Sequence, residues 1–309
     1  MAISASEVKR LREETGAGMM DCKKALTETN GNYDEAIEYL RKNGQAKAEK
    51  KANRIAAEGI CHIAQENDET AVVVEVNSET DFVANNEKFR TYVDEVAKQA
   101  LHSKTDDIDA FLDEKWESDP EKTVKDALND EIAVIGEKLS IRRFTRLTAE
   151  NGFVGGYTHG GGKIAVLVSA ECSVINDESK QAVHNVAMQI AAMNPKYLSD
   201  ADIDQEFIDH ETEIIKAQIE NDPKEAAKPD KVKAGMIKGR LNKELKEVCL
   251  MDQEFFLDSK QSVKKYIESV SKSIGAQLVI TKYVRFETGE GLEKRSENFA
   301  EEVAKQMAN

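Results

Sequence analysis

The sequence predicts an α+β protein, with a small helical module in front of a duplicated core of antiparallel sheets and helices. Three observations support this fold class. The first 44 residues carry apolar side chains at helical spacing, interrupted at Gly16 and Gly31. Segments with period-two alternation then precede helical segments, and this order occurs twice along the chain. The pattern I-G-x-x-L-x-I also occurs twice, beginning at Ile135 and at Ile274.

Three short helices are expected in the first 44 residues, where they would form a compact module. Ser4 and Glu7 make an S-x-x-E capping box before the first helix, and Asn32 is a suitable cap for the third. Gly44 is expected to end the third helix. Residues 45–56 are rich in Ala and Lys and contain neither Pro nor Gly, so they would follow as a helical connector.

The first copy of the core begins with a hairpin. Period-two alternation predicts strands at 59–64 and 71–76, and a helix is expected at 86–101. The acidic residues 110–128, which contain the only tryptophan, are expected to be helical. A strand at 139–144 ends this copy.

The second copy repeats this order and carries an insertion. Strands are expected at 153–158 and 163–170 around a triple glycine, with a helix at 178–193. An offset of 93 residues aligns the two hairpins, whereas 139 aligns the two I-G-x-x-L-x-I strands, so the second copy is longer by 46 residues. A first arm with a near seven-residue apolar repeat and a second apolar arm predict an antiparallel helical hairpin between about 199 and 250.

A final helix is expected because Phe299, Val303 and Met307 recur every four residues. The expected domains are a three-helix module with its linker (1–55), a first core subdomain (56–145), a second core subdomain with the inserted hairpin (146–288) and a C-terminal helical module (289–309).

The charge balance bears on the class of partner. A formal net charge of −15 repels nucleic acid and anionic membranes, so neither is expected as the main partner. No apolar run approaches the roughly 18 residues that span a bilayer, and the N-terminus lacks the features of a secretory signal. Four scattered cysteines fit a reducing compartment, so a cytoplasmic location is expected.

Catalytic, metal and cofactor sites are not expected. The five histidines form no H-E-x-x-H pattern, and no G-x-S-x-G elbow is present. Gly160-Gly161-Gly162-Lys163 suggests a phosphate loop, but such a loop needs a following helix, and here a strand is expected. The segment is therefore interpreted as a hairpin turn, which leaves His159 beside it available to a partner.

The most informative segment is Thr80-Asp81-Phe82-Val83, which lies between an expected strand and an expected helix. Thr80 or Asp81 would cap the helix, and Phe82 would lie in its first turn. Two interpretations of Phe82 stay open: it packs into the local core, or it points outward as an anchor for a partner's pocket. An anchor of the second kind contributes on the order of 2 kcal/mol or more to binding.

Met19 and Met20 present a similar choice at the start of the second helix. Only one of them fits an inward-facing stripe, so ordinary packing of the pair competes with exposure. An exposed methionine beside Arg12 and Lys23 would offer an adaptable contact surface.

These segments resemble the elongation factor Ts family of translation factors. The resemblance is carried by T-G-A-G-M-M-D-C-K-K-A-L, which begins at Thr15, and by T-D-F-V at residues 80–83; it extends over essentially the whole chain. It implies a guanine-nucleotide exchange factor for the GTPase elongation factor Tu. It also implies a ubiquitin-associated-like N-terminal module, a two-subdomain core, a coiled-coil insertion and a C-terminal helical module.

The resemblance also implies roles for individual residues. The positions that match the segment displacing Mg²⁺ from the partner are Thr80, Asp81, Phe82 and Val83. The positions that match other partner contacts are Arg12, Met19, Met20 and Lys23 in the N-terminal module, and Ile135, Gly136 and His159 in the core. No cofactor, no direct contact with nucleic acid and no membrane are implied, and a homodimer or a 2:2 complex with the GTPase stays open.

Two other functions compete with this one. An adaptor or chaperone-like interaction module built on the first 44 residues would leave the duplicated core without a role. A nucleotide-using enzyme centred on residues 160–163 would bind GDP directly, so binding of labelled GDP to the isolated chain would favour it.

Overall fold

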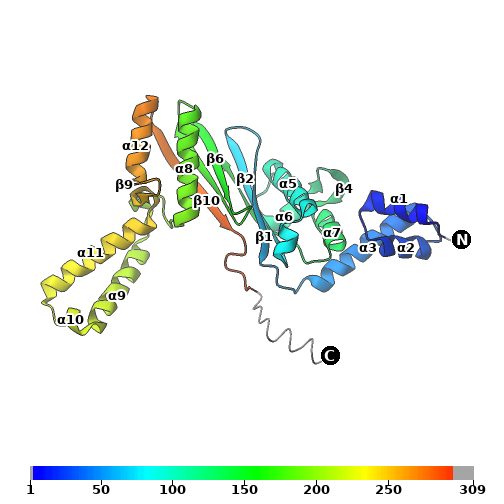
Figure 1. Cartoon of the computed structure of the whole chain (residues 1–309), viewed down its shortest axis with the longest axis horizontal. Helices are drawn as coiled ribbons and strands as arrows, with labels where there is room; N and C mark the ends of the chain where they lie inside the picture. Colours follow the sequence, from blue (N-terminus) through cyan, green and yellow to red (C-terminus); the bar gives the residue numbers. More distant parts are fainter. Residues whose placement is uncertain (1–2, 295–309) are drawn as a thin grey trace.

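A computed structural model describes residues 3–294 of the chain. Figure 1 shows a helical module at one end, a core of two sheets flanked by helices in the middle, and a projecting helical hairpin at the other end. The α+β class with antiparallel sheets is as predicted. The predicted final helix with Phe299 lies outside the described residues.

The N-terminal module contains three helices around a small core. Ser4 and Glu7 form the predicted capping box, because the Glu7 amide donates to Ser4 Oγ at 3.2 Å and the Ser4 amide donates to Glu7 Oε2 at 2.7 Å. The helices are α1 (Ala5–Thr15), α2 (Met19–Glu28) and α3 (Tyr33–Lys51). The buried residues between them are Val8, Leu11, Cys22, Ala25, Leu26 and Ala36.

The prediction that Gly44 ends the third helix is wrong, since α3 continues through Gly44 to Lys51 and includes most of the expected connector. Gly44 is buried against α7 (Val124–Ile135), and a Cβ built on it would lie 3.5 Å from the Ala133 Cβ. A glycine inside a helix costs roughly 1 kcal/mol relative to alanine. The packing of α3 on α7 offsets this cost, and at 3.5 Å the position still has room for a Cβ in ordinary van der Waals contact.

The first subdomain is a three-stranded antiparallel sheet with the strand order β1-β2-β5. Helices cover one of its faces, and the largest buried core of the subdomain lies between them and the sheet. The strands are β1 (Glu58–Gln65), β2 (Thr70–Ser78) and β5 (Ser140–Thr148), and the helices besides α7 are α4 (Asp81–Ala84), α5 (Glu87–His102) and α6 (Ile108–Asp113).

The second subdomain has the same plan, with the strand order β10-β7-β6. Its helices also pack on a single face of the sheet. The strands are β6 (Gly152–His159), β7 (Ile164–Cys172) and β10 (Leu278–Glu287), and the helices are α8 (Asp177–Met193) and α12 (Val263–Ile274).

The two sheets pack against each other through their remaining faces, which gives four layers in the order helices, sheet, sheet, helices (Figure 1). Val73 and Leu147 come from the first sheet, and Leu167 and Phe286 come from the second. This third apolar cluster lies between the two sheets and joins the two subdomains.

The prediction of a single acidic helix over 110–128 is wrong. Residues 108–135 form α6, a small hairpin of β3 (Lys115–Trp116) and β4 (Asp119–Thr123), and then α7. Pro120 lies in β4, and a proline inside a helix loses a hydrogen bond and clashes with the preceding turn. Trp116 is buried there, with its ring centroid 6.1 Å from that of Tyr92.

The second copy contains the equivalent hairpin, β8 (Glu254–Phe255) with β9 (Asp258–Ser262), directly before α12. The repeated unit is therefore β-β-α-β-β-α-β, with the two short additional helices α4 and α6 in the first copy, rather than the shorter β-β-α-β that the sequence suggested.

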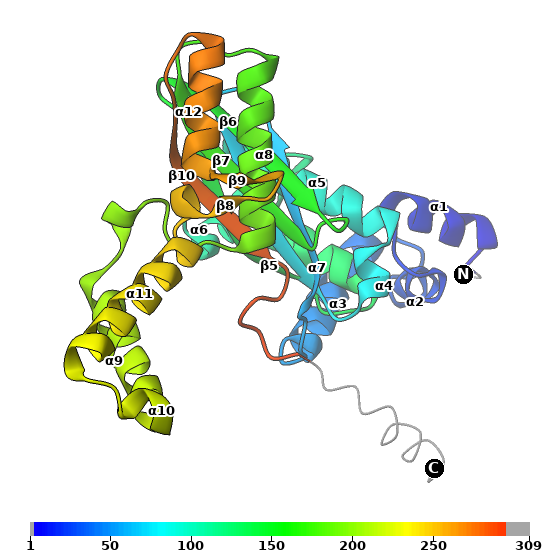
Figure 2. The ribbon, with the colours of Figure 1, turned by 60° about the vertical axis from the view of Figure 1, so that its left-hand side comes forward.

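The predicted inserted hairpin is confirmed. Its arms α9 (Gln205–Asn221) and α11 (Asp230–Val248) lie side by side and are joined by α10 (Pro223–Ala226). Figure 2 shows the hairpin projecting away from the core. Short 3₁₀ turns at Asp200–Asp202 and Leu250–Asp252 flank the arms. Within residues 3–294, no helix is both long enough and apolar enough to cross a membrane.

Candidate partner-binding surface

Phe82 lies on the one-turn helix α4 and points away from the protein. Its side chain is 85% exposed, the largest exposed fraction of any large apolar side chain in residues 3–294. Thr80 is the N-cap, and its Oγ1 accepts a hydrogen bond from the Val83 amide at 3.4 Å. The structure therefore agrees with the second interpretation of Phe82, in which the side chain points outward into solvent.

The turn below Phe82 is held by the core. Ala84 is buried, and Val83 packs against the apolar cluster of the first subdomain. Glu137 accepts hydrogen bonds from the Glu79 amide at 3.1 Å, the Thr80 amide at 3.0 Å and Thr80 Oγ1 at 2.7 Å. These three hydrogen bonds, which we call the Glu137 brace, hold the backbone that presents the exposed aromatic ring. Asp81, beside it, is exposed.

Ile135 and Gly136 stand at the end of α7 and help to place this brace. Gly136 adopts the left-handed conformation with φ 86°, and its amide bonds to the Ile132 carbonyl. The chain turns there, so that Glu137 reaches the backbone before α4. Ile135 is half-buried and packs on the core, whereas Gly136 is exposed.

The α4 turn is an addition to the first copy of the repeat. Gly59 and Gly152 occupy equivalent places, because a Cβ on either would collide with the neighbouring strand, at Asn77 and Glu171 respectively. From those two residues the chain continues to the equivalent N-caps of α5 and α8, at 86 and 176. Eight residues intervene in the first copy and four in the second, so the extra length equals the four residues of α4.

The turn between β6 and β7 lies close to α4. His159 is exposed, and its Nδ1 is 2.9 Å from the Tyr157 hydroxyl. Arg90, in the helix after α4, donates to the Gly161 carbonyl at 2.8 Å. A cavity of about 250 Å³ is lined by residues from both segments, including Asp81 and Gly160. The turn leads into a strand, as the hairpin interpretation predicts, and not into a helix.

The N-terminal module presents a second group of predicted residues. Met19 and Met20 are both exposed, at 53% and 73%, so neither packs in the small core. Arg12 and Lys23 are exposed as well. The start of this surface lies near α5, because a Cβ built on Gly16 would be 3.2 Å from Lys88 Nζ.

Cys61 and Cys249 are poor nucleophiles. All four cysteines are free and buried. Burial raises the pKa of Cys61 to about 12 and that of Cys249 to about 11. Thiols with such pKa values stay protonated near neutral pH, and the thiolate is the reactive form.

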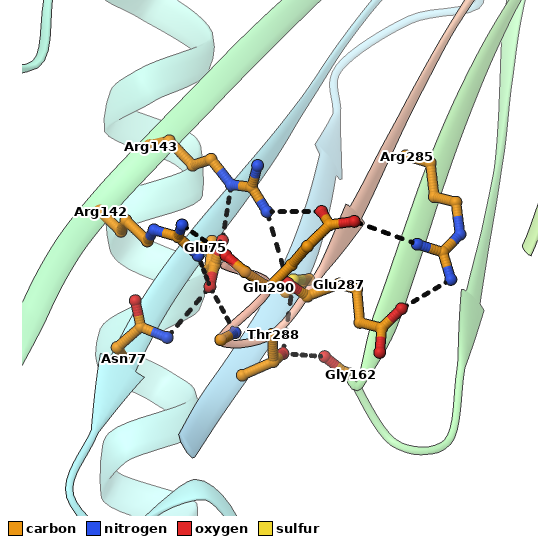
Figure 3. Close-up of polar contacts among 11 residues, drawn as sticks. Glu75, Asn77, Arg142, Arg143, Gly162, Arg285, Glu287, Thr288 and Glu290 are labelled. Carbon is orange, nitrogen blue, oxygen red and sulfur yellow. Dashed lines mark hydrogen bonds and ion pairs between the residues drawn. The ribbon is translucent and has the colours of Figure 1, made fainter. Parts of the chain in front are cut away.

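Sequence reasoning missed a buried ionic cluster around Glu75 (Figure 3). Glu75 is fully buried in β2, and its carboxylate accepts from Arg143 Nε at 2.6 Å, Arg142 Nη1 at 3.0 Å and the Gly289 amide at 2.8 Å. Burial alone would raise the pKa of Glu75, but hydrogen bonds from Gly289 and Asn77 and the charge of Arg143 together lower it. One glutamate inside an otherwise apolar strand was the clue in the sequence.

Comparison with known proteins gives one result throughout. The family model described as Elongation factor TS matches residues 79–290. The chain is 50% identical over 306 residues to "Elongation factor Ts" of Clostridioides difficile (strain 630), with 99% of each chain covered. Identity to "Elongation factor Ts" of Clostridium novyi (strain NT) is 48% over 306 residues, again with 99% of each chain covered. The chain therefore belongs to the elongation factor Ts family of translation elongation factors.

Proposed function

We propose that the chain is a guanine-nucleotide exchange factor that binds the GTPase elongation factor Tu, dislodges its Mg²⁺ and promotes release of GDP. It acts by protein–protein binding and not as an enzyme, with no cofactor of its own. The observation that carries this proposal is Phe82, an 85% exposed aromatic ring on a short, braced turn. A large apolar side chain in that position suits insertion into a partner's pocket.

Exchange of this kind requires no chemistry. GDP and Mg²⁺ hold each other in the GTPase, because the ion bridges phosphate oxygens and neutralises their charge. A protein that binds the metal-free and nucleotide-free GTPase more tightly must weaken nucleotide binding by the same factor. Each 1.4 kcal/mol of such coupling lowers nucleotide affinity about tenfold.

Residues 80–83 would supply this coupling. Burial of the Phe82 ring in the partner is worth about 2 kcal/mol, which is enough to drive a local displacement. The Glu137 brace matters because, without it, residues 80–83 would move on binding and the partner would not be displaced. Thr80 and Val83 hold the turn, and Asp81 places a negative charge beside the ring.

The Phe82 side chain, inserted into the partner, would act as a wedge, and the other predicted contacts would add binding energy on either side of it. Arg12, Met19, Met20 and Lys23 form an exposed group on the N-terminal module, where methionine adapts to a partner's shape. Gly136 with Ile135, and His159 on the β6–β7 turn, contribute from the core.

The remaining features of the proposal concern setting and organisation. We place the protein in the cytoplasm, without direct contact to nucleic acid or membranes, and take 1–55, 56–145, 146–288 and 289–309 as its domains. Sedimentation of the purified complex would separate a 1:1 assembly from a 2:2 assembly.

Release of labelled GDP from elongation factor Tu tests the proposal. Catalytic amounts of the chain should accelerate release, and Asp81→Ala combined with Phe82→Ala should slow the accelerated rate at least tenfold, because about 2 kcal/mol of anchor energy is removed. Val232→Ala is the matched control, since it removes an exposed apolar side chain from α11. Full activity of the double variant would eliminate the wedge, and GDP binding to the isolated chain would favour an enzyme instead.

A further inference from the structure

The last residue of β10 and the three residues after it, 287–290, connect the first subdomain to the β6–β7 turn; we call them the clasp (Figure 3). On one side, the Gly289 amide donates to Glu75 at 2.8 Å, and Arg142 Nη2 donates to the Glu290 carbonyl at 2.6 Å. On the other side, the Thr288 amide donates to the Lys163 carbonyl at 2.9 Å, and its hydroxyl donates to the Gly162 carbonyl at 3.1 Å.

The side chains around the clasp form a balanced ionic network. Arg142 and Arg143 both bind Glu75, and Arg143 also lies 3.4 Å from Glu290. On the second sheet, Arg285 pairs with Glu287 at 2.8 Å. Glu75 is the buried member of this network, whereas Glu287 and Glu290 are half-exposed. A buried ion pair is weak support for stability, because apolar packing of the same volume often does better. The network contributes specificity instead, because charge-assisted hydrogen bonds to Glu75 favour one relative position of the clasp and the first sheet.

The clasp has little freedom to shift along the sheet. Gly289 adopts φ 72°, and a Cβ there would lie 2.1 Å from the Ala57 carbonyl oxygen, so no other residue fits without movement. The guanidinium of Arg143 lies over the Phe286 ring, with 4.1 Å to its centroid, just before the clasp. Shape and charge therefore select the same register.

Glu75 stands between two of the proposed partner contacts. Along β2 the chain leads from Glu75 to Thr80 and Phe82 within seven residues. Through the clasp, the same carboxylate is linked to Gly162, and thus to the turn that carries His159. The two contacts belong to different subdomains, so their separation depends on the clasp together with the Arg90–Gly161 hydrogen bond and the packing between the two sheets.

We propose that Glu75 is a positioning residue for nucleotide exchange: through the clasp it fixes the spacing between Phe82 and the β6–β7 turn, so that both engage the GTPase together. This inference rests on the proposed function. If the clasp were flexible, the first subdomain would shift when Phe82 binds, and the partner would be displaced less. Loss of Glu75 should therefore reduce the maximal rate of GDP release more than it weakens partner binding.

Glu75→Gln tests the proposal in the full chain, because it keeps the size of the side chain and removes its charge. Glu171→Gln is the matched control, an exposed glutamate on β7 with no ion pair among the described residues. We expect a maximal release rate about tenfold lower for Glu75→Gln, with the half-saturating concentration changed less than about twofold. Wild-type values are expected for Glu171→Gln.

A double-mutant cycle separates positioning from a general folding defect. In a Phe82→Ala background, Glu75→Gln should lower the rate by less than about twofold, because there is no wedge left to position. A folding defect would multiply the two losses. A multiplicative result would overturn the proposal.

A second variant and a distance measurement cover the case in which Glu75→Gln does not fold. Thr288→Val removes the hydroxyl that donates to the Gly162 carbonyl and also lies 3.4 Å from Cys61 Sγ, and it should give a smaller loss of the same kind. Spin labels on Asn85→Cys and Thr158→Cys, two exposed sites beside the contacts, should show a broader distance distribution in either variant. A distribution as narrow as in the parent protein, or a broad one with an unchanged release rate, would refute the role of Glu75. If the wild-type chain did not accelerate GDP release from elongation factor Tu, the proposed function itself would be refuted instead.

Discussion

The Glu137 brace gives the sharpest quantitative prediction. Glu137 accepts from two backbone amides and one hydroxyl, at distances between 2.7 and 3.1 Å. Each such bond contributes about 1 kcal/mol net, and half-burial of the site reduces the total to about 2 kcal/mol. Glu137→Ala should therefore lower the local stability of residues 79–84 by about 2 kcal/mol, which corresponds to amide exchange about 30-fold faster.

Hydrogen exchange of the Glu79 and Thr80 amides is the direct assay, because these amides are the donors to Glu137. Glu137→Gln is an intermediate case, since its amide group keeps one acceptor oxygen and loses the other. GDP release should slow in the same order, with Phe82 itself untouched. If the two amides exchange faster while the release rate stays at the wild-type value, a braced turn is not needed for the wedge, and the reasoning fails.

Two further predictions concern stability. Gly44→Ala should be neutral or stabilising by up to about 1 kcal/mol, because its Cβ would lie 3.5 Å from the Ala133 Cβ. Gly44→Leu should lower the free energy of unfolding by about 1–3 kcal/mol, because the larger side chain forces α3 away from α7. Urea unfolding measures both, and equal stability of the two variants would contradict this packing. Burial raises the pKa of Glu131 above its ordinary 4.5, so the folded state holds this proton more tightly than the unfolded state does, and the carboxyl costs stability increasingly as the pH rises above about 4.5. Glu131→Gln should therefore raise the melting temperature at pH 7 and have little effect at pH 4, and a pH-independent difference would show another cause.

The α4 turn is found in only one copy of the duplicated unit. Both copies contain two strands, a capped helix, a small hairpin, a second helix and a last strand. They differ at two connections: α4 lies after β2 in the first copy alone, and α6 of the first copy stands where the second copy has the helical hairpin. Insertions at strand–helix connections leave the buried layers unchanged, so they are tolerated and available for function.

Much of the candidate site could be predicted from local sequence. The context of Thr80 predicted a cap for the following helix with Phe82 in its first turn; Thr80 does cap a helix, but that helix is the separate turn α4, and Asn86 caps α5. The turn before Lys163 was predicted from its glycines and the strand that follows. Local sequence did not decide where Phe82 points, because a ring in a first helical turn suits a core or a surface equally well. Its exposure follows from the way Val83 and Ala84 bury the other side of α4.

The sequence by itself determined the features that depend on near neighbours: the Ser4 capping box, the hairpins, the repeat and the inserted helical arms. Caps, turns and periodicity involve residues a few positions apart, so their physics can be followed along the chain. Tertiary structure alone decided that α3 runs through Gly44, because the compensating contact is with Ala133 on another helix. It also decided the Glu75 cluster, whose bond to Gly289 spans 214 residues. A buried charge is stable only where its partners converge, and that convergence exists only after the two sheets have packed.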